Sequence, residues 1–361
     1  MPLTQAKVKT LQGKLCAAFT ISLLLIPAAF AGDEEQQSYC KYVTEEAAAQ
    51  RNLLRTPNAI AGLTQPNTGL PTQLVWGVSG SLSNVRKAGL TMDEARKNCA
   101  LYGAASSAQR AIQYALPSLE KEALQHRLGL IEKASENLEA LLTMTRKMLE
   151  AQNVTRPMAF ALQTTKIKLE ADRADTQSRI TAIYAPQVGD TPLKELVAEK
   201  QGSEANERRA LDRLARQNNW DVALSVGAHQ QVNPLVGNQG AYGEVTVSYN
   251  LASHAINKHL DQAASAYDDW KKVQEGDVTR NAENLKQQVM SGLSVQDGRL
   301  KALQEEQKQI ESNLQLLGRA ETSAAMDFFN QLSTAQLLLG IEIGDASFRL
   351  ERLKEFLGRN F

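Results

Sequence analysis

Histidine is the side chain that most often acts as a general base or metal ligand near neutral pH, and this chain has few histidines. The four are His126, His229, His254 and His259. His254 and His259 are five positions apart, so a helix would not place them on one face as an i, i+4 pair. No Ser/His/Asp spacing or metal-binding pattern accompanies any of them. The sequence therefore predicts no catalytic residues, no metal site and no cofactor, and it favours a protein that is not an enzyme.

The first residues have the pattern of an export signal. Lys7, Lys9 and Lys14 precede an apolar run, which ends in the small-residue cleavage site Ala29-Phe30-Ala31. We expect residues 1–31 to be a cleaved signal peptide; the alternative is an uncleaved membrane anchor. Without them the chain has 37 basic and 40 acidic residues, because the segment contains three of the 40 lysines and arginines and none of the 40 acids. No basic patch suggests a nucleic-acid partner.

Two cysteines of the mature chain are predicted to form a disulfide, since exported proteins commonly carry them. Cys40 lies 17 residues before Pro57, where the first strand region begins, and Cys99 lies 15 residues after Asn84, where that region ends. If both flanking segments are helices that leave the same end of the strands, a rise of ~1.5 Å per residue brings the two cysteines to similar depths. The alternative is a pair of buried free thiols.

Two segments alternate strictly between apolar and polar residues, which is typical of strands with one apolar face. They are residues 220–230 and 241–251, and each is about as long as the ~9–11 residues of a tilted membrane-crossing strand. Trp220, Val222 and Leu224 exemplify the apolar set. We expect the polar set to face a watery interior: Asp221, Ser225, His229, Glu244, Thr246, Ser248 and Asn250.

The same order of elements occurs twice after the signal peptide. Residues 32–186 form the first predicted repeat, with a helix, a strand pair at 59–83, a long helix and a return helix. Residues 187–361 form the second, in which the strand pair at 220–251 takes the corresponding place. The two repeats together give four strands in a chain that is otherwise helical.

The long helices are predicted at about 90–151 and 253–317, and their apolar residues recur at alternating steps of three and four. This period is typical of coiled coils. On the first helix the seam consists of Leu124, Leu128, Ile131, Ser135, Leu138, Leu142, Thr145 and Leu149. We therefore expect a mostly α-helical fold of long antiparallel coiled-coil helices with a small β part.

Four strands cannot close a membrane barrel, because the smallest barrels have about eight. An open sheet in lipid would leave unpaired backbone groups at its edges. The chain is therefore expected to assemble: two copies would give eight strands with a packed interior, and three would give twelve strands with a lumen.

The mature chain resembles the TolC-like outer-membrane factor family over nearly its whole length. The resemblance rests on the doubled order of elements, on the strand YGEVTVSYNL at residues 242–251, and on the segment GRAETSAAMDFF at 318–329. That segment is similar to the family's tip pattern, in which a glycine, a small polar residue and an aspartate open the return helix. The first tip, with Pro157 and Ala159, departs from this pattern.

This resemblance implies a homotrimer that forms a 12-stranded β-barrel in the outer membrane, continuous with an α-helical tunnel across the periplasm. The tunnel would be the exit duct of a tripartite efflux or type I secretion system, docked on a periplasmic adaptor protein and an inner-membrane transporter. Contacts near the tips hold such tunnels shut, which makes gate candidates of Arg156, Arg319, Glu321 and Asp327. The competing interpretations are a periplasmic adaptor and a coiled-coil scaffold protein without a channel.

Overall fold

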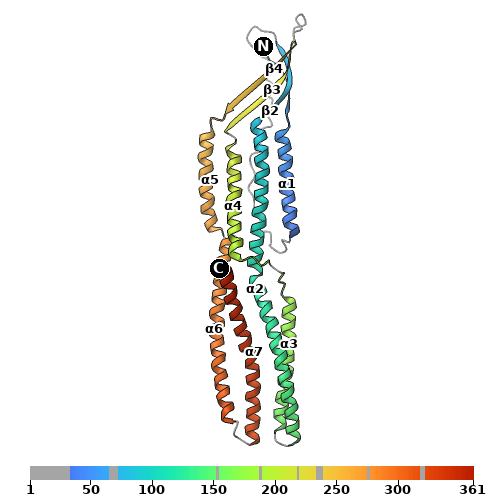
Figure 1. The fold of residues 1–361 in the computed structure, drawn as a ribbon, viewed down its shortest axis with the longest axis vertical. Helices are drawn as coiled ribbons and strands as arrows, with labels where there is room; N and C mark the ends of the chain where they lie inside the picture. Colours follow the sequence, from blue (N-terminus) through green and yellow to red (C-terminus); the bar gives the residue numbers. More distant parts are fainter. Residues whose placement is uncertain are drawn as a thin grey trace, which may run out of the picture.

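The computed structural model is an elongated molecule with a small sheet at one end and long helices along the rest of its length (Figure 1). It describes residues 33–64, 72–151, 154–186, 189–217, 219–232, 239–274, 277–317 and 322–361. In chain order the elements are α1 (Asp33–Arg55), β1 (Asn58–Thr64), β2 (Gln73–Ser81), α2 (Leu82–Glu150), α3 (Arg156–Ala182), α4 (Leu193–Arg216), β3 (Trp220–Gln231), β4 (Gln239–Tyr249), α5 (Ser253–Val273), α6 (Val278–Leu317) and α7 (Ser323–Asn360). The fold is mostly α-helical with a four-stranded sheet, as predicted; the predicted signal peptide lies outside the described residues.

The four strands form one antiparallel sheet in the order β1-β2-β3-β4. Its central pairing runs from Gln73 opposite Gln231 to Ser81 opposite Ala223, so it joins the two strand pairs that are far apart in sequence. The strand ends differ from the predicted ones by one or two residues.

The first long helix, α2, begins at Leu82 directly after β2, which is earlier than the predicted start near residue 90. Ser81 is its N-cap, and the Ser81 Oγ atom accepts a hydrogen bond from the backbone N–H of Asn84 at 3.0 Å. A serine in this position satisfies one of the free N–H groups at a helix start. The strand therefore passes into the helix without a loop, and the helix continues through Pro117.

The second long helix is broken, which corrects the prediction of one helix over 253–317. α5 ends at Val273 and α6 begins at Val278. Asp277 lies in the break, where its Oδ1 atom accepts a hydrogen bond from Lys200 Nζ at 2.7 Å. Lys200 of α4 is only 7% exposed, and a buried ammonium group requires a carboxylate partner. Asp277 therefore pairs with Lys200 from the segment between α5 and α6, outside both helices.

The helical core lies mainly along α2. Five predicted seam positions of this helix are buried: Leu124, Ile131, Leu138, Leu142 and Thr145. One apolar cluster joins α2 to α3 and α7 through Leu162 and Ile341, and a second joins α2 to α4 and α6 through Leu193 and Val289. Among the described helices, none is both long and apolar enough to cross a membrane.

Candidate functional site

The sheet has one apolar and one polar face, because its register keeps like residues together across the strands. Val78 lies opposite Val226, and Val222 lies opposite Val247. The larger apolar side chains of the apolar face are Leu63, Leu74, Trp76, Val78, Trp220, Val222, Leu224, Val226, Val245, Val247 and Tyr249, accompanied by the polar exceptions Gln230 and Gln239. The polar side chains of the other face are Asn58, Thr64, Gln73, Ser79, Ser81, Asp221, Ser225, His229, Gln231, Tyr242, Glu244, Thr246 and Ser248, accompanied by the apolar exceptions Ile60, Val75 and Ala223.

The apolar face is exposed in the single chain. Trp220 is 58% exposed, Val247 61% and Val245 66%. The helices begin at the lower ends of the strands and extend away from the sheet (Figure 1). A contiguous exposed apolar surface of this kind marks a contact with protein or lipid.

Both edges of the sheet are free. β1 and β4 each have one neighbour in the described sheet, so one side of each strand presents unpaired N–H and C=O groups. These groups would require partners in a lipid environment. The geometry thus provides two edges that further chains could complete.

The structure places six of the predicted interior residues on the polar face, as the sequence pattern suggested. Ser225 lies opposite Glu244, and Asp221 lies opposite Ser248. Asn250 is the exception, because β4 ends at Tyr249. The backbone N–H of Asn250 donates to the Asn219 carbonyl at 2.9 Å, and its Oδ1 atom accepts a bond from the Ala252 N–H at 3.0 Å. Asn250 therefore belongs to the turn between β4 and α5, since an asparagine can bond the backbone two residues on.

Below the sheet, α1 is fastened to α2 by a disulfide and two tyrosines. Cys40 and Cys99 are bonded, with their Cα atoms 5.0 Å apart. The rings of Tyr39 and Tyr102 stack with centroids 4.0 Å apart, and the Tyr102 hydroxyl donates to Glu35 at 2.7 Å. Burial, followed by this carboxylate, raises the pKa of Tyr102 to about 12.

Lower in the molecule, a cluster of ion pairs joins the hairpin of α2 and α3 to the hairpin of α6 and α7. Arg127 of α2 contacts Asp172 of α3 at 2.9 Å and Glu342 of α7 at 2.8 Å. Arg349 of α7 pairs with Glu120 of α2 and with Asp345. The remaining members are Arg179 of α3, which contacts Glu120, and Arg299 of α6, which contacts Glu342.

At the opposite end from the sheet, one predicted gate residue connects the two hairpins. The Asp327 carboxylate of α7 accepts a hydrogen bond from Thr155 Oγ1 at 2.9 Å and another from the Thr155 N–H at 3.4 Å. Thr155 is the N-cap of α3, where an anionic group is favoured by the helix dipole. Arg156 is exposed beside it. Arg319 and Glu321 lie outside the described residues.

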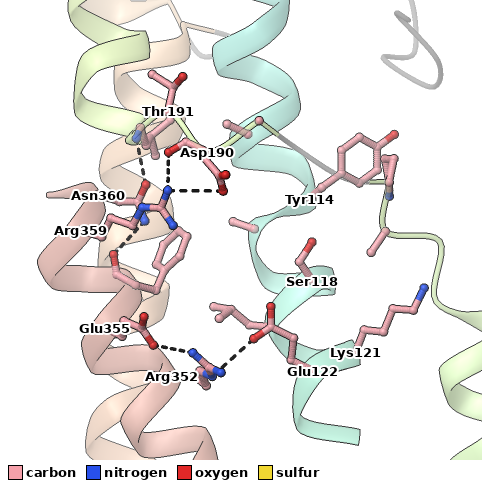
Figure 2. A pocket seen from close by; sticks show the side chains of 18 of the residues that line it. Tyr114, Ser118, Lys121, Glu122, Asp190, Thr191, Arg352, Glu355, Arg359 and Asn360 are labelled. Carbon is pink, nitrogen blue, oxygen red and sulfur yellow. Dashed lines mark hydrogen bonds and ion pairs between the residues drawn. The ribbon is translucent and has the colours of Figure 1, made fainter. Parts of the chain in front are cut away.

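A cleft lies between α2 and the end of α7, and Figure 2 shows ion pairs among the charged side chains that line it, with Lys121 apart from them. Arg352 bridges Glu122 and Glu355, and Arg359 contacts the carbonyl and carboxylate of Asp190. These contacts fasten the end of α7 to α2 and to the segment before α4. No group of three or more metal-ligating side chains occurs among the described residues.

Comparison with known proteins finds similar structures only. No protein-family model and no curated protein sequence matches the chain. A membrane protein from Pseudomonas aeruginosa is 14% identical with a TM-score of 0.48, covering 90% of this chain and 86% of that one. The outer membrane protein VceC from Vibrio cholerae is 14% identical with a TM-score of 0.44, covering 91% and 92%. The MtrE outer membrane channel of Neisseria gonorrhoeae is 13% identical with a TM-score of 0.42, covering 91% and 86%.

At such identities and scores these similarities describe a likeness of fold alone.

Proposed function

We propose that three copies of this chain form an outer-membrane channel-tunnel, the exit duct of a tripartite efflux or type I secretion system. Three four-stranded sheets would close into a barrel of twelve strands, in which the free edges of β1 and β4 find partners in neighbouring copies. The apolar face would contact lipid, the polar face would line the pore, and the helices would continue as a tunnel in the periplasm.

One observation carries the proposal: an exposed apolar face lies opposite a polar face on a sheet with two free edges. A water-soluble scaffold gains nothing from exposing Val245, Val247 and Trp220 together. β3 and β4 have 12 and 11 residues, close to the ~9–11 residues that a tilted strand needs to cross a bilayer.

The further parts of the proposal come from the family resemblance. Residues 1–31 would direct export and be removed, the tips would dock on a periplasmic adaptor protein, and an inner-membrane transporter would supply the substrate. The two predicted repeats, 32–186 and 187–361, would each give one strand pair and one helical hairpin to the tube. Arg156, Arg319, Glu321 and Asp327 would act at the tunnel tip.

The decisive experiment is extraction of the full chain from outer membranes with a mild detergent. The expected product migrates as a trimer when unheated and as a monomer after boiling, and it gives single-channel currents in planar bilayers. A water-soluble periplasmic monomer without channel activity would refute the proposal and favour the scaffold.

A further inference from the structure

Two ring side chains on the polar face lie against glycines of the neighbouring strand. Tyr242 lies opposite Gly227, and His229 lies opposite Gly240. A Cβ atom added to Gly240 would be 2.5 Å from His229 Cε1, and one added to Gly227 would be 2.7 Å from Tyr242 Cε1 and 2.2 Å from the Trp76 carbonyl oxygen. The His229 ring thus occupies the space that a side chain on Gly240 would fill, and the Tyr242 ring shares the corresponding space over Gly227 with the β2 backbone.

The glycine surface beneath Tyr242 extends onto β2. Gly77 lies opposite Gly227, and a Cβ atom added to Gly77 would be 2.3 Å from the Val226 carbonyl oxygen. The two strands therefore approach closely at a point where neither has a side chain. An aromatic ring laid over a glycine in the adjacent strand covers such bare backbone.

Burial supports this arrangement. Tyr242 and His229 are half-buried, although both belong to the polar face. On the same face of β4, Glu244, Thr246 and Ser248 are exposed. Tyr242 is thus less exposed than these polar-face neighbours on β4, and His229 is half-buried, as Asp221 and Ser225 on β3 are.

We propose that Tyr242 and His229 set the bore of the barrel, and that Gly227 and Gly240 are the seats that hold these rings against the wall. This inference rests on the proposed function, in which the polar face lines the pore. A ring that lies along the wall takes less of the lumen than one that projects from it. In a trimer each ring occurs three times, so their orientation determines the largest solute that passes this level.

Gly240→Ala provides the cleanest test, because the three atoms nearest to the new Cβ all belong to the His229 side chain. The methyl group would displace the imidazole toward the lumen. Measured in an Asp327→Asn background, in which the tip contact no longer limits the current, single-channel conductance should fall, and the cut-off for neutral polyethylene glycols should shift to smaller polymers. The double variant His229→Ala/Gly240→Ala should restore conductance to at least the level of that background.

The matched control is Gly62→Ala. Gly62 lies on the same face of the sheet, opposite Val75, and an added Cβ would have nothing within 4 Å. In the same background, this variant should leave the conductance unchanged. The currents are recorded in about 1 M KCl, where the Debye length is ~3 Å. Because charges are screened there, a change in conductance reports the position of the ring and not its charge.

The second test is Tyr242→Ala, which removes the larger ring. In the same background, conductance should rise and the polymer cut-off should shift to larger sizes, while Tyr242→Phe should keep the values of that background because the ring remains. If Gly240→Ala does not assemble into a channel, the comparison of Tyr242→Ala with Tyr242→Phe tests the proposal by itself. A conducting wild type with unchanged currents in the variants that assemble would overturn the role of the rings; a wild type that forms no channel would instead contradict the proposed function.

Discussion

At the scale of single residues, a buried carboxylate and a half-buried one give the protein a stability that depends on pH. Glu207 of α4 is 9% exposed and lies near Glu94 of α2. Burial is the main cause that raises the pKa of both carboxyls; the charge of Glu94 raises the pKa of Glu207 further, and Arg208 lowers it. A carboxyl whose pKa rises on folding destabilises the folded state at any pH above that pKa, because its ionised form is disfavoured there. The destabilisation fades as the pH falls through the folded pKa toward the ordinary value of 4.5.

The variant Glu207→Gln should therefore stabilise the protein near neutral pH, by about 1 kcal/mol, which is a common size for a single substitution. The melting temperature of the variant should exceed that of the wild type at about pH 7.5, and the difference should shrink toward about pH 4.5. Glu306→Gln on the exposed face of α6 is the matched control and should leave both melting temperatures unchanged. A pH-independent difference for Glu207→Gln would contradict the assignment.

Asp327 is the tip residue for which the structure suggests a direct test. Its carboxylate bonds the N-cap of α3, and a charged acceptor at a helix N-terminus contributes ~0.3–1 kcal/mol. Asp327→Asn should weaken the contact between the hairpins and raise single-channel conductance. Asp175→Asn, on the exposed side of α3, should not. If the two variants give equal currents, Asp327 has no role in holding the tunnel shut.

At the scale of elements, the ion-pair cluster fixes one helical hairpin against the other. The Arg127 side chain is 17% exposed and that of Asp345 is 3% exposed, at a distance of 3.6 Å. Arg127→Ala removes a cation that three acids share, although Asp345 keeps Arg349 and Glu342 keeps Arg299, and we expect a loss of about 2 kcal/mol. The control is Arg173→Ala, whose partner Glu132 belongs to the same hairpin and whose pair is about half exposed, with a loss of at most about 1 kcal/mol. Urea unfolding measured by circular dichroism distinguishes the two, and similar losses would contradict the role of the cluster.

The disulfide should decide whether α1 stays on α2. Among the described residues of α1, Ala47 is the only one that is fully buried, so apolar packing contributes little. Replacing Cys40 and Cys99 with serine should cost about 4 kcal/mol, because the bond closes a loop of 59 residues. Hydrogen–deuterium exchange should then increase over α1 while α2 stays protected. Unchanged protection of α1 would show that the tyrosine contacts suffice.

The regular parts of the fold were predictable from the sequence because their periodicity is local. Alternation located the strands to within two residues, and steps of three and four located the buried seam of α2. In the break after α5, Asp277 contacts Lys200, 77 positions away, and the hairpin cluster consists of pairs such as Arg349 with Glu120. The glycine seats depend on the β3–β4 register, which alternation alone does not fix. Each of these features needed contacts between distant residues.

At the scale of the whole molecule, the environment of the sheet distinguishes a channel from a water-soluble scaffold. Val245, near the middle of β4, is 66% exposed on the apolar face, and Thr246 is exposed on the polar face beside it. An arginine at either position is harmless if both faces meet water. In a barrel, an arginine on the lipid face costs about 2–4 kcal/mol near the bilayer midplane, whereas one facing the lumen is tolerated.

We therefore expect Val245→Arg to abolish the heat-modifiable trimer in outer-membrane extracts, and Thr246→Arg to leave the trimer in place with altered ion selectivity. The two substitutions introduce the same side chain at adjacent positions of β4, so strand propensity and net charge are matched. Semi-native electrophoresis measures the trimer, and reversal potentials in a salt gradient measure selectivity. If Val245→Arg assembles as well as Thr246→Arg, the apolar face does not meet lipid, and its exposed side chains must instead pack against another protein.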